Sequence, residues 1–191
     1  TFVDCTGDGD LAARAGCPFE KGGPSGFCQP MTLCFKLSGV DKARCPDGAK
    51  RQELYLAAKE AGRIHYPREN VLLFNYFDED VIHFNTTRII QKDATDGVQL
   101  SEAEIEARRQ LRELLAWLRD SVPGYEQARV HSIAHHIGVR ESRRILGRAY
   151  LTRDDFIKRA KFPDGIARVS YGIDIHSPTG TGTEILHMPD G

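Results

Sequence analysis

Hydrophobic and polar positions follow two different periods along the chain, and this pattern predicts both strands and helices. Residues 31–38 alternate between apolar and more polar side chains, which is typical of a half-buried strand. Two apolar runs at 71–77 and 81–90 are joined by an acidic triplet and predict a β-hairpin. The last predicted strand, 166–176, also alternates. These four segments would form much of a sheet.

Helical periodicity and capping signals predict four helices. The first two cover residues 11–15 and 49–61, and each is followed by a glycine. The longest begins at Ser101, with Glu104 completing a capping box, and a Pro-Gly pair ends it. A fourth, short helix is capped by Thr152. The apolar stripe of the longest helix consists of Leu111, Leu114, Leu115 and Leu118.

Weaker apolar runs at 1–5, 128–133 and 137–145 predict further short strands, and the Gly- and Pro-rich stretch 20–30 predicts a loop. Strands and helices are interspersed, but hairpins dominate the middle of the chain. This order favours an α+β fold, with a largely antiparallel sheet flanked by helices, over repeated βαβ units.

Composition and charge narrow the class of protein. The chain has 191 residues, is 40% hydrophobic and carries a formal net charge of -1, which is enough for one sizeable core. A near-neutral charge argues against general binding of nucleic acids or membrane surfaces. Because no apolar run approaches about 18 residues, we expect no transmembrane helix. The expected location is cytoplasmic unless an N-terminal signal has been lost. Without an initiator Met, Thr1 and Gly191 suggest that both ends are cut from a longer protein.

The cysteine and histidine patterns do not predict a metal site. All five cysteines lie in the first 45 residues, without a Cys-x-x-Cys pair. We interpret them as reduced, structural thiols, and a redox pair beside a cofactor stays open as an alternative. His131, His135 and His136 have no carboxylate or cysteine at a recognised ligand spacing, so core or hydrogen-bonding roles are favoured.

The segment 4–12, Asp-Cys-Thr-Gly-Asp-Gly-Asp-Leu-Ala, has the form of a nucleotide-contacting turn. Gly7 and Gly9 permit close backbone approach, and the helix that follows offers free N–H groups to an anion. However, this helix is too short for a dinucleotide-binding unit, and the three Asp residues would repel a pyrophosphate. A tight turn in which the Asp residues act as caps is therefore an equally good interpretation.

Two later segments carry candidate chemistry. In 129–148, five arginines stand against one glutamate, which suits a bound anion, although many of them can instead pair with carboxylates or lie in solvent. Arg140, Glu141 and Ser142 lie together within it. Asp174 and His176 share one face of the last predicted strand, where they form either a general acid–base pair or a structural pair.

Four segments together resemble a bacterial family of FAD-dependent oxidoreductases of the glutathione-reductase-like type. Residues 1–16 are similar to the internal Ala-Thr-Gly-Asp-Gly-Asp segment of that family, with Cys5 in the usual Ala place. The blocks 29–32, 137–145 and 171–176 also resemble family segments, and Gly-Val-Arg-Glu-Ser-Arg-Arg is the most specific of them.

The resemblance implies the substrate-side region of a two-domain flavoprotein. Residues 1–20 would be a remnant of the FAD-binding domain, and residues 21–191 a substrate or cap region in which 130–148 returns toward the flavin. We expect the main Gly-x-Gly-x-x-Gly unit and a late closing segment to lie outside the chain. FAD is then expected in the full-length protein and not in this chain, and the other partners would be a small-molecule substrate and the missing N-terminal segment.

The resemblance also assigns residue roles. The cofactor-contacting residues would be Thr6, Gly7, Asp8, Gly9, Glu141 and Ser142. Arg140 would stabilise charge, and Asp174 or His176 would transfer a proton while a hydride moves between the substrate and the flavin. Two rivals stay open: a non-redox module that holds an anionic ligand on its arginine-rich strand, and a nucleotide-binding protein whose Gly7–Ala12 turn binds phosphate directly.

Overall fold

The structure is a computed structural model in which residues 1–188 are described. Helices and antiparallel strands alternate along the chain, and this confirms the expected α+β class. The elements are α1 (Asp10–Arg14), β1 (Phe19–Lys21), β2 (Phe35–Ser38), α2 (Gly48–Glu60), β3 (Leu73–Asn75), β4 (Ile82–Phe84), α3 (Gly97–Ser121), β5 (Arg129–Ile133), β6 (Arg143–Ile145), α4 (Arg153–Ile157), β7 (Ile173–His176) and β8 (Thr183–Leu186).

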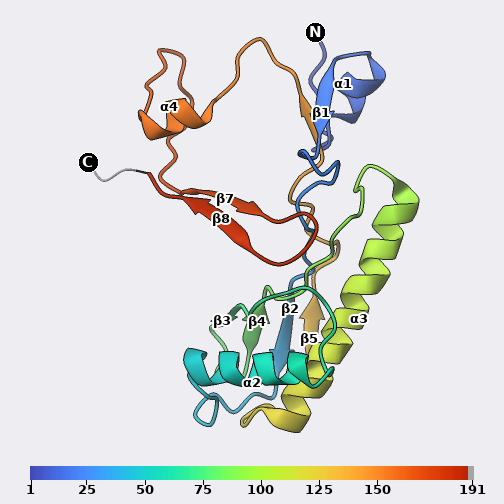
Figure 1. Cartoon of the computed structure of the whole chain (residues 1–191), viewed down its shortest axis with the longest axis vertical. Helices are drawn as coiled ribbons and strands as arrows, with labels where there is room; N and C mark the ends of the chain where they lie inside the picture. The colour runs from blue at the N-terminus through green and yellow to red at the C-terminus, as the bar shows by residue number, and fades with distance from the viewer. Residues whose placement is uncertain (189–191) are drawn as a thin grey trace.

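The main body is a four-stranded antiparallel sheet in the order β3-β4-β2-β5, with α2 and α3 packed against it (Figure 1). The hairpin predicted between 71 and 90 is confirmed as β3 and β4. Phe35 of β2 lies opposite Phe84 of β4, and their rings stack with centroids 5.1 Å apart. Burial of these rings beneath the helices forms the centre of the core.

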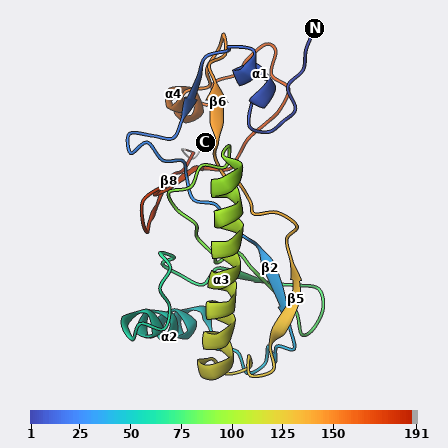
Figure 2. The same cartoon turned by 90° about the vertical axis from the view of Figure 1, so that its right-hand side faces the viewer.

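The long helix α3 runs along the whole body and reaches beyond the sheet (Figure 2). Its predicted apolar stripe is confirmed, since Leu111, Leu114 and Leu118 are buried in the core and Leu115 packs against it. The predicted start at Ser101 is wrong. The helix begins four residues earlier, because the carboxylate of Asp96 accepts hydrogen bonds from Val98 N and Gln99 N.

Two smaller units lie beyond the sheet. Strands β1 and β6 form a two-stranded ribbon next to α1, and β7 and β8 form a hairpin between that ribbon and the main body (Figure 1). The short helix α4 is capped as predicted, by a reciprocal capping box between Thr152 and Asp155. Neither α1 nor α4 has a buried residue, so neither helix is anchored in a hydrophobic core.

Most of the predicted strands are too long. The one at 31–38 contains only Phe35–Ser38, and the one at 81–90 only Ile82–Phe84. Residues 1–5 form no strand, because they have no pairing partner among the described residues. In 137–145 only Arg143–Ile145 is a strand, since the chain leaves the main sheet after a single bridge from Gly138 to Thr32. In 166–176 only Ile173–His176 pairs, because its partner β8 is just four residues long.

Strands β1 and β8 were not predicted. The loop expected at 20–30 begins at residue 22, two residues later than predicted, because β1 extends to Lys21. None of the described helices has the length and apolar character that a bilayer crossing requires. The last three residues of the 21–191 region lie outside the described part of the chain.

Candidate functional site

The turn between residues 4 and 12 is held together by the carboxylate of Asp4. Its Oδ1 accepts hydrogen bonds from Thr6 N at 3.0 Å and Thr6 Oγ1 at 2.7 Å, and its Oδ2 accepts one from Ala12 N at 2.8 Å. Thr6 Oγ1 in turn accepts from Asp10 N at 2.9 Å. These bonds, with that from the Thr6 hydroxyl first among them, lower the pKa of Asp4. Asp4 and Thr6 therefore shape the turn.

The two glycines of this turn have different surroundings. Both adopt left-handed backbone conformations, with φ of 83° at Gly7 and 65° at Gly9. A Cβ placed on Gly9 would lie 2.9 Å from Cδ1 of Ile145 in β6, whereas one on Gly7 would meet nothing within 4 Å. Gly9 therefore packs against the ribbon, and Gly7 leaves open space beside the backbone.

An open cleft of about 560 Å³ lies between this turn and the segment that leads into β6. Gly7 and Asp8 form part of its lining, Gln29 contributes from a distant loop, and residues 139–144 supply the rest. The N–H groups of Gly7 and Asp8 donate to no acceptor within residues 1–188. Segments separated by more than a hundred residues therefore meet at one cleft.

Arginine side chains from β6 tie the lining together. Arg143 donates to Asp8 O at 3.1 Å and forms an ion pair with Asp10, so it fixes the Gly-Asp-Gly turn against the ribbon. Arg144 forms an ion pair with Glu141 and donates to a backbone carbonyl of the β1 loop at 2.7 Å. Both guanidinium groups are thus occupied by structural contacts.

Arg140 differs from its two neighbours. Its side chain is exposed, it lines the cleft, and within the described chain it takes part in no ion pair or hydrogen bond. Of the three arginines in the lining, it alone therefore has a guanidinium group available to a ligand.

Glu141 and Ser142 line the same cleft and are held firmly. Glu141 Oε2 accepts a hydrogen bond of 2.8 Å from Gln29 N. Ser142 is buried, and its carbonyl faces the thiol of Cys28 at 3.9 Å. Burial, followed by the charge of Glu141, raises the pKa of that thiol, so Cys28 is an unreactive neighbour of the cleft.

Asp174 and His176 lie on β7 and are not part of the lining. His176 Nε2 lies 3.1 Å from Asp174 Oδ2, and its Nδ1 lies 3.0 Å from the hydroxyl of Thr183 on β8. Burial, followed by the positive charge of Arg140, lowers the pKa of His176. The imidazole is therefore neutral at pH 7, with Nε2–H donating to Asp174 and Nδ1 accepting from Thr183.

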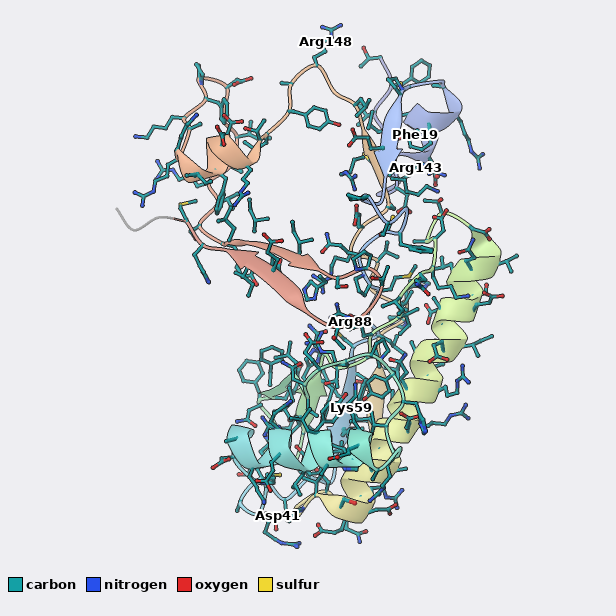
Figure 3. All side chains as sticks on the ribbon, in the orientation of Figure 1. Phe19, Asp41, Lys59, Arg88, Arg143 and Arg148 are labelled. Carbon is teal, nitrogen blue, oxygen red and sulfur yellow. The ribbon has the colours of Figure 1, made fainter. Side chains whose placement is uncertain are left out.

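Two residues to which the sequence assigned no role, Gln29 and Arg88, connect the β7–β8 hairpin to the cleft and to the main body. Gln29 lines the cleft, and its Oε1 accepts a 2.9 Å hydrogen bond from His176 N. Arg88 follows β4, and its side chain is 1% exposed and reaches the β7–β8 turn (Figure 3). The resemblance places Gln29 within a family block, whereas nothing in the local sequence distinguishes Arg88.

The described residues offer no cluster of metal-binding side chains. Among residues 1–188, no group of three or more His, Cys, Asp or Glu side chains is placed to hold a metal ion. His131, His135 and His136 are all exposed.

Comparison with known families decides the class of protein. The family model described as FAD dependent oxidoreductase matches residues 1–190. The chain belongs to this family. Neither a curated protein nor a solved structure matches it. The family implies a redox flavoprotein function in general, and FAD binding in its full-length members.

The cleft has features that suit an FAD-dependent oxidoreductase. FAD carries polar and anionic groups, and the lining offers the unpaired N–H groups of Gly7 and Asp8 together with the available guanidinium of Arg140. The open space at Gly7 also admits a ligand directly against the backbone. The residues present therefore fit the cofactor that the family implies.

Proposed function

We propose that the chain is the substrate-side region of a flavoprotein that transfers a hydride between a small-molecule substrate and FAD. The observation that carries this proposal is the meeting of the Gly7–Asp8 turn and the 139–144 segment at one cleft. When bound, FAD supplies the redox chemistry, and the chain's own residues bind, orient and exclude water.

The chain path supports the division into two parts. Residues 1–20 would belong to the FAD-binding domain, and 21–191 would form the substrate or cap region. Strand β5 pairs with β2 in the main sheet, and β6 then pairs with β1 beside the N-terminal turn. The segment 130–148 thus runs from the body back to the proposed cofactor side.

We assign cofactor contact to the cleft residues Gly7, Asp8, Glu141 and Ser142. Thr6 and Gly9 would act on the same cofactor by shaping the turn, since Thr6 is bonded to Asp4 and Gly9 packs on β6.

Arg140 is the proposed charge-stabilising residue, because its guanidinium is exposed in the cleft and has no carboxylate partner there. Asp174 and His176 form the proposed proton-transfer pair, supported by their 3.1 Å contact. Both ring nitrogens of His176 are engaged, so proton transfer requires one of these contacts to open.

The available Arg140 also supports the rival function, a non-redox module that binds an anionic ligand. The second rival, direct phosphate binding by the Gly7–Ala12 turn, is less well supported. The N–H groups of Asp10 and Ala12 already donate to Thr6 and Asp4, so fewer donors are left for a phosphate.

Flavin uptake tests the proposal. The chain is compared with the same chain extended upstream in its natural reading frame, and the flavin absorbance of each is measured after purification with excess FAD. We expect stoichiometric flavin in the extended protein and little in the chain alone, since the main pyrophosphate contacts would lie upstream. A folded extended protein that stays colourless would contradict the proposal and favour the non-redox module.

A further inference from the structure

The cleft continues toward the β7–β8 hairpin through Gln29. Its backbone N–H donates to Glu141 in the cleft lining, and its side-chain oxygen accepts from the backbone of His176. His176 is therefore one hydrogen-bonded residue away from the cleft, although it does not line it. The side chain of His176 is 12% exposed, so a small ligand can reach only part of the ring.

The hairpin is fixed from the other side by Arg88. Nη2 donates to Ser177 O at 3.1 Å and to Gly182 O at 2.9 Å, and Nη1 pairs with Glu69 at 3.4 Å. Figure 3 shows Arg88 at the junction of the hairpin and the main body. Because Ser177 follows His176 in the chain, these bonds fix the backbone next to His176.

Positively charged groups from several segments act on this junction. Arg88 and Arg140 come from different segments, and each lowers the pKa of His176. Arg140 and Arg68 also lower the pKa of Arg88, although burial is the largest cause. Two carboxylates also face this junction: Glu69 pairs with Arg88, and Asp174 accepts a hydrogen bond from the neutral ring of His176.

Neither of these carboxylates forms an ion pair with Arg140, so its guanidinium group is open to an anion from outside the described chain. Nε of Arg88 is also buried without a hydrogen-bond partner among the described residues. Arg140 is the group that a ligand entering from the cleft can reach, because it is exposed there and free of ion pairs in the described chain.

We propose that a small carboxylate binds to Arg140 where the cleft meets the β7–β8 hairpin, with His176 beside it. A planar guanidinium group matches a carboxylate through two parallel hydrogen bonds, and this geometry selects it over a neutral amide. The assignment of this carboxylate as part of the substrate rests on the proposed function. The substrate would then be a carboxylic acid, oriented by its charged end.

Calorimetric titration of the chain with propionate at pH 7 tests the site, with propionamide as the neutral counterpart. We expect saturable propionate binding with a dissociation constant of about millimolar order, and no binding of propionamide. Arg140→Gln should weaken propionate binding at least about tenfold, since it removes the charge and one of the two parallel donors. Arg148→Gln is the matched control, because Arg148 is exposed on a loop far from the junction (Figure 3).

A second measurement separates binding at this site from binding elsewhere. NMR titration of His176 should show its pKa rising when propionate is added, because a nearby negative charge favours the imidazolium. The charged groups that face this ring are Asp174 on its own strand, Arg140 and Arg88. Arg140→Gln should abolish the effect of propionate on the pKa, and Arg148→Gln should preserve it.

Equal propionate affinity in wild type and Arg140→Gln would overturn the proposal. A His176 pKa that does not change when propionate is added would also overturn it. Inorganic pyrophosphate distinguishes the other source of an anion, the cofactor itself. If Arg140→Gln loses pyrophosphate binding but keeps propionate binding, the guanidinium serves the cofactor and the proposal fails. Since no flavin is needed, failure of flavin uptake in the extended protein would leave a positive propionate result intact and would contradict only the redox function.

Discussion

Single residues of the N-terminal turn act through their backbone as much as through their side chains. Asp4 closes the turn with its carboxylate, while a Cβ on Gly9 would lie 2.9 Å from Cδ1 of Ile145 in β6, so that this side chain would have to shift. Gly7 has the same left-handed conformation but faces open space. The left-handed conformation thus favours glycine at both positions. Packing against β6 adds to this at Gly9, and access to the backbone adds to it at Gly7.

Substitution of Gly9 by Ala should therefore destabilise the protein more than the same change at another left-handed glycine. Gly16 is the control, because its φ is 84° and a Cβ there would meet nothing within 4 Å. The left-handed conformation costs Ala about 1–2 kcal/mol at either position, and overpacking against Ile145 adds about 1–3 kcal/mol at Gly9. The free energies of unfolding of both variants, measured by urea titration, check this. Equal losses would show that β6 moves aside without cost.

The sequence singled out residues that are consecutive in the chain, and it missed two residues that act on the site from distant positions. Arg140, Glu141 and Ser142 are consecutive, and all line the cleft. Gln29 and Arg88 act on the β7–β8 hairpin from 147 and 89 to 94 positions away. No local period or spacing encodes such contacts, so only the folded chain reveals them.

Among the elements, α3 shows how a cap sets the position of a helix. Asp96 accepts two backbone hydrogen bonds and also pairs with the side-chain amide of Gln99. Ser101, the predicted cap, lies within the helix and donates its hydroxyl to Gly97 O. Glu104 instead accepts from Ile137 N in a later segment. Ser101 and Glu104 therefore have the spacing of a capping box but do not cap the helix.

Alanine substitutions distinguish the two candidate caps. Asp96→Ala should lower the free energy of unfolding by about 0.5–2 kcal/mol, because two N–H groups of the first turn lose their acceptor. Ser101→Ala should change it by less than about 0.5 kcal/mol, since alanine is a good helix former and the lost bond is exposed. Chemical denaturation monitored by circular dichroism measures both. A larger loss at Ser101 than at Asp96 would contradict the assigned start of α3.

Strand boundaries were less predictable than helices for a physical reason. A helix satisfies its own hydrogen bonds, so its stripe and caps are visible locally. A strand exists only where a partner lies beside it, and the partner of Ile173–His176 is Thr183–Leu186, which has no clear alternation. The apolar residues Ile166 and Val169, which were assigned to the same strand, remain exposed and unpaired in the described chain.

At the scale of the whole molecule, side-chain bonds hold the smaller units to the main body. Lys21 of the ribbon pairs with Asp93 at 2.6 Å before α3, and Arg88 holds the β7–β8 turn through two carbonyl groups. The hairpin contributes no residue to either buried cluster of the core. Arg88 is therefore the main described attachment of its turn to the body.

Replacement of Arg88 by Met should release the hairpin from the body. Loss of the charged hydrogen bonds should cost about 1.5–3 kcal/mol, and amide hydrogen exchange should rise in residues 173–186 more than in α3. Arg63→Met is the control, because Arg63 is exposed and bonds to Ser121 and Asp120 at the far end of α3. Exchange measured by mass spectrometry should leave the hairpin unchanged in that variant. Unchanged hairpin exchange in Arg88→Met would disprove the attachment.

The pairing of β1 with β6 has a consequence for modularity. Lys21 and Arg143 are Cα partners in adjacent antiparallel strands, so the chain leaves the ribbon and re-enters it at nearly the same point. Residues 22–142, with the entire main sheet, are topologically an insertion into a β-hairpin. A two-residue turn would be long enough to join the two strands directly. The body can therefore be exchanged or lengthened in a related protein without re-routing the ribbon, and the cleft is kept as long as Gln29 and residues 139–142 are retained.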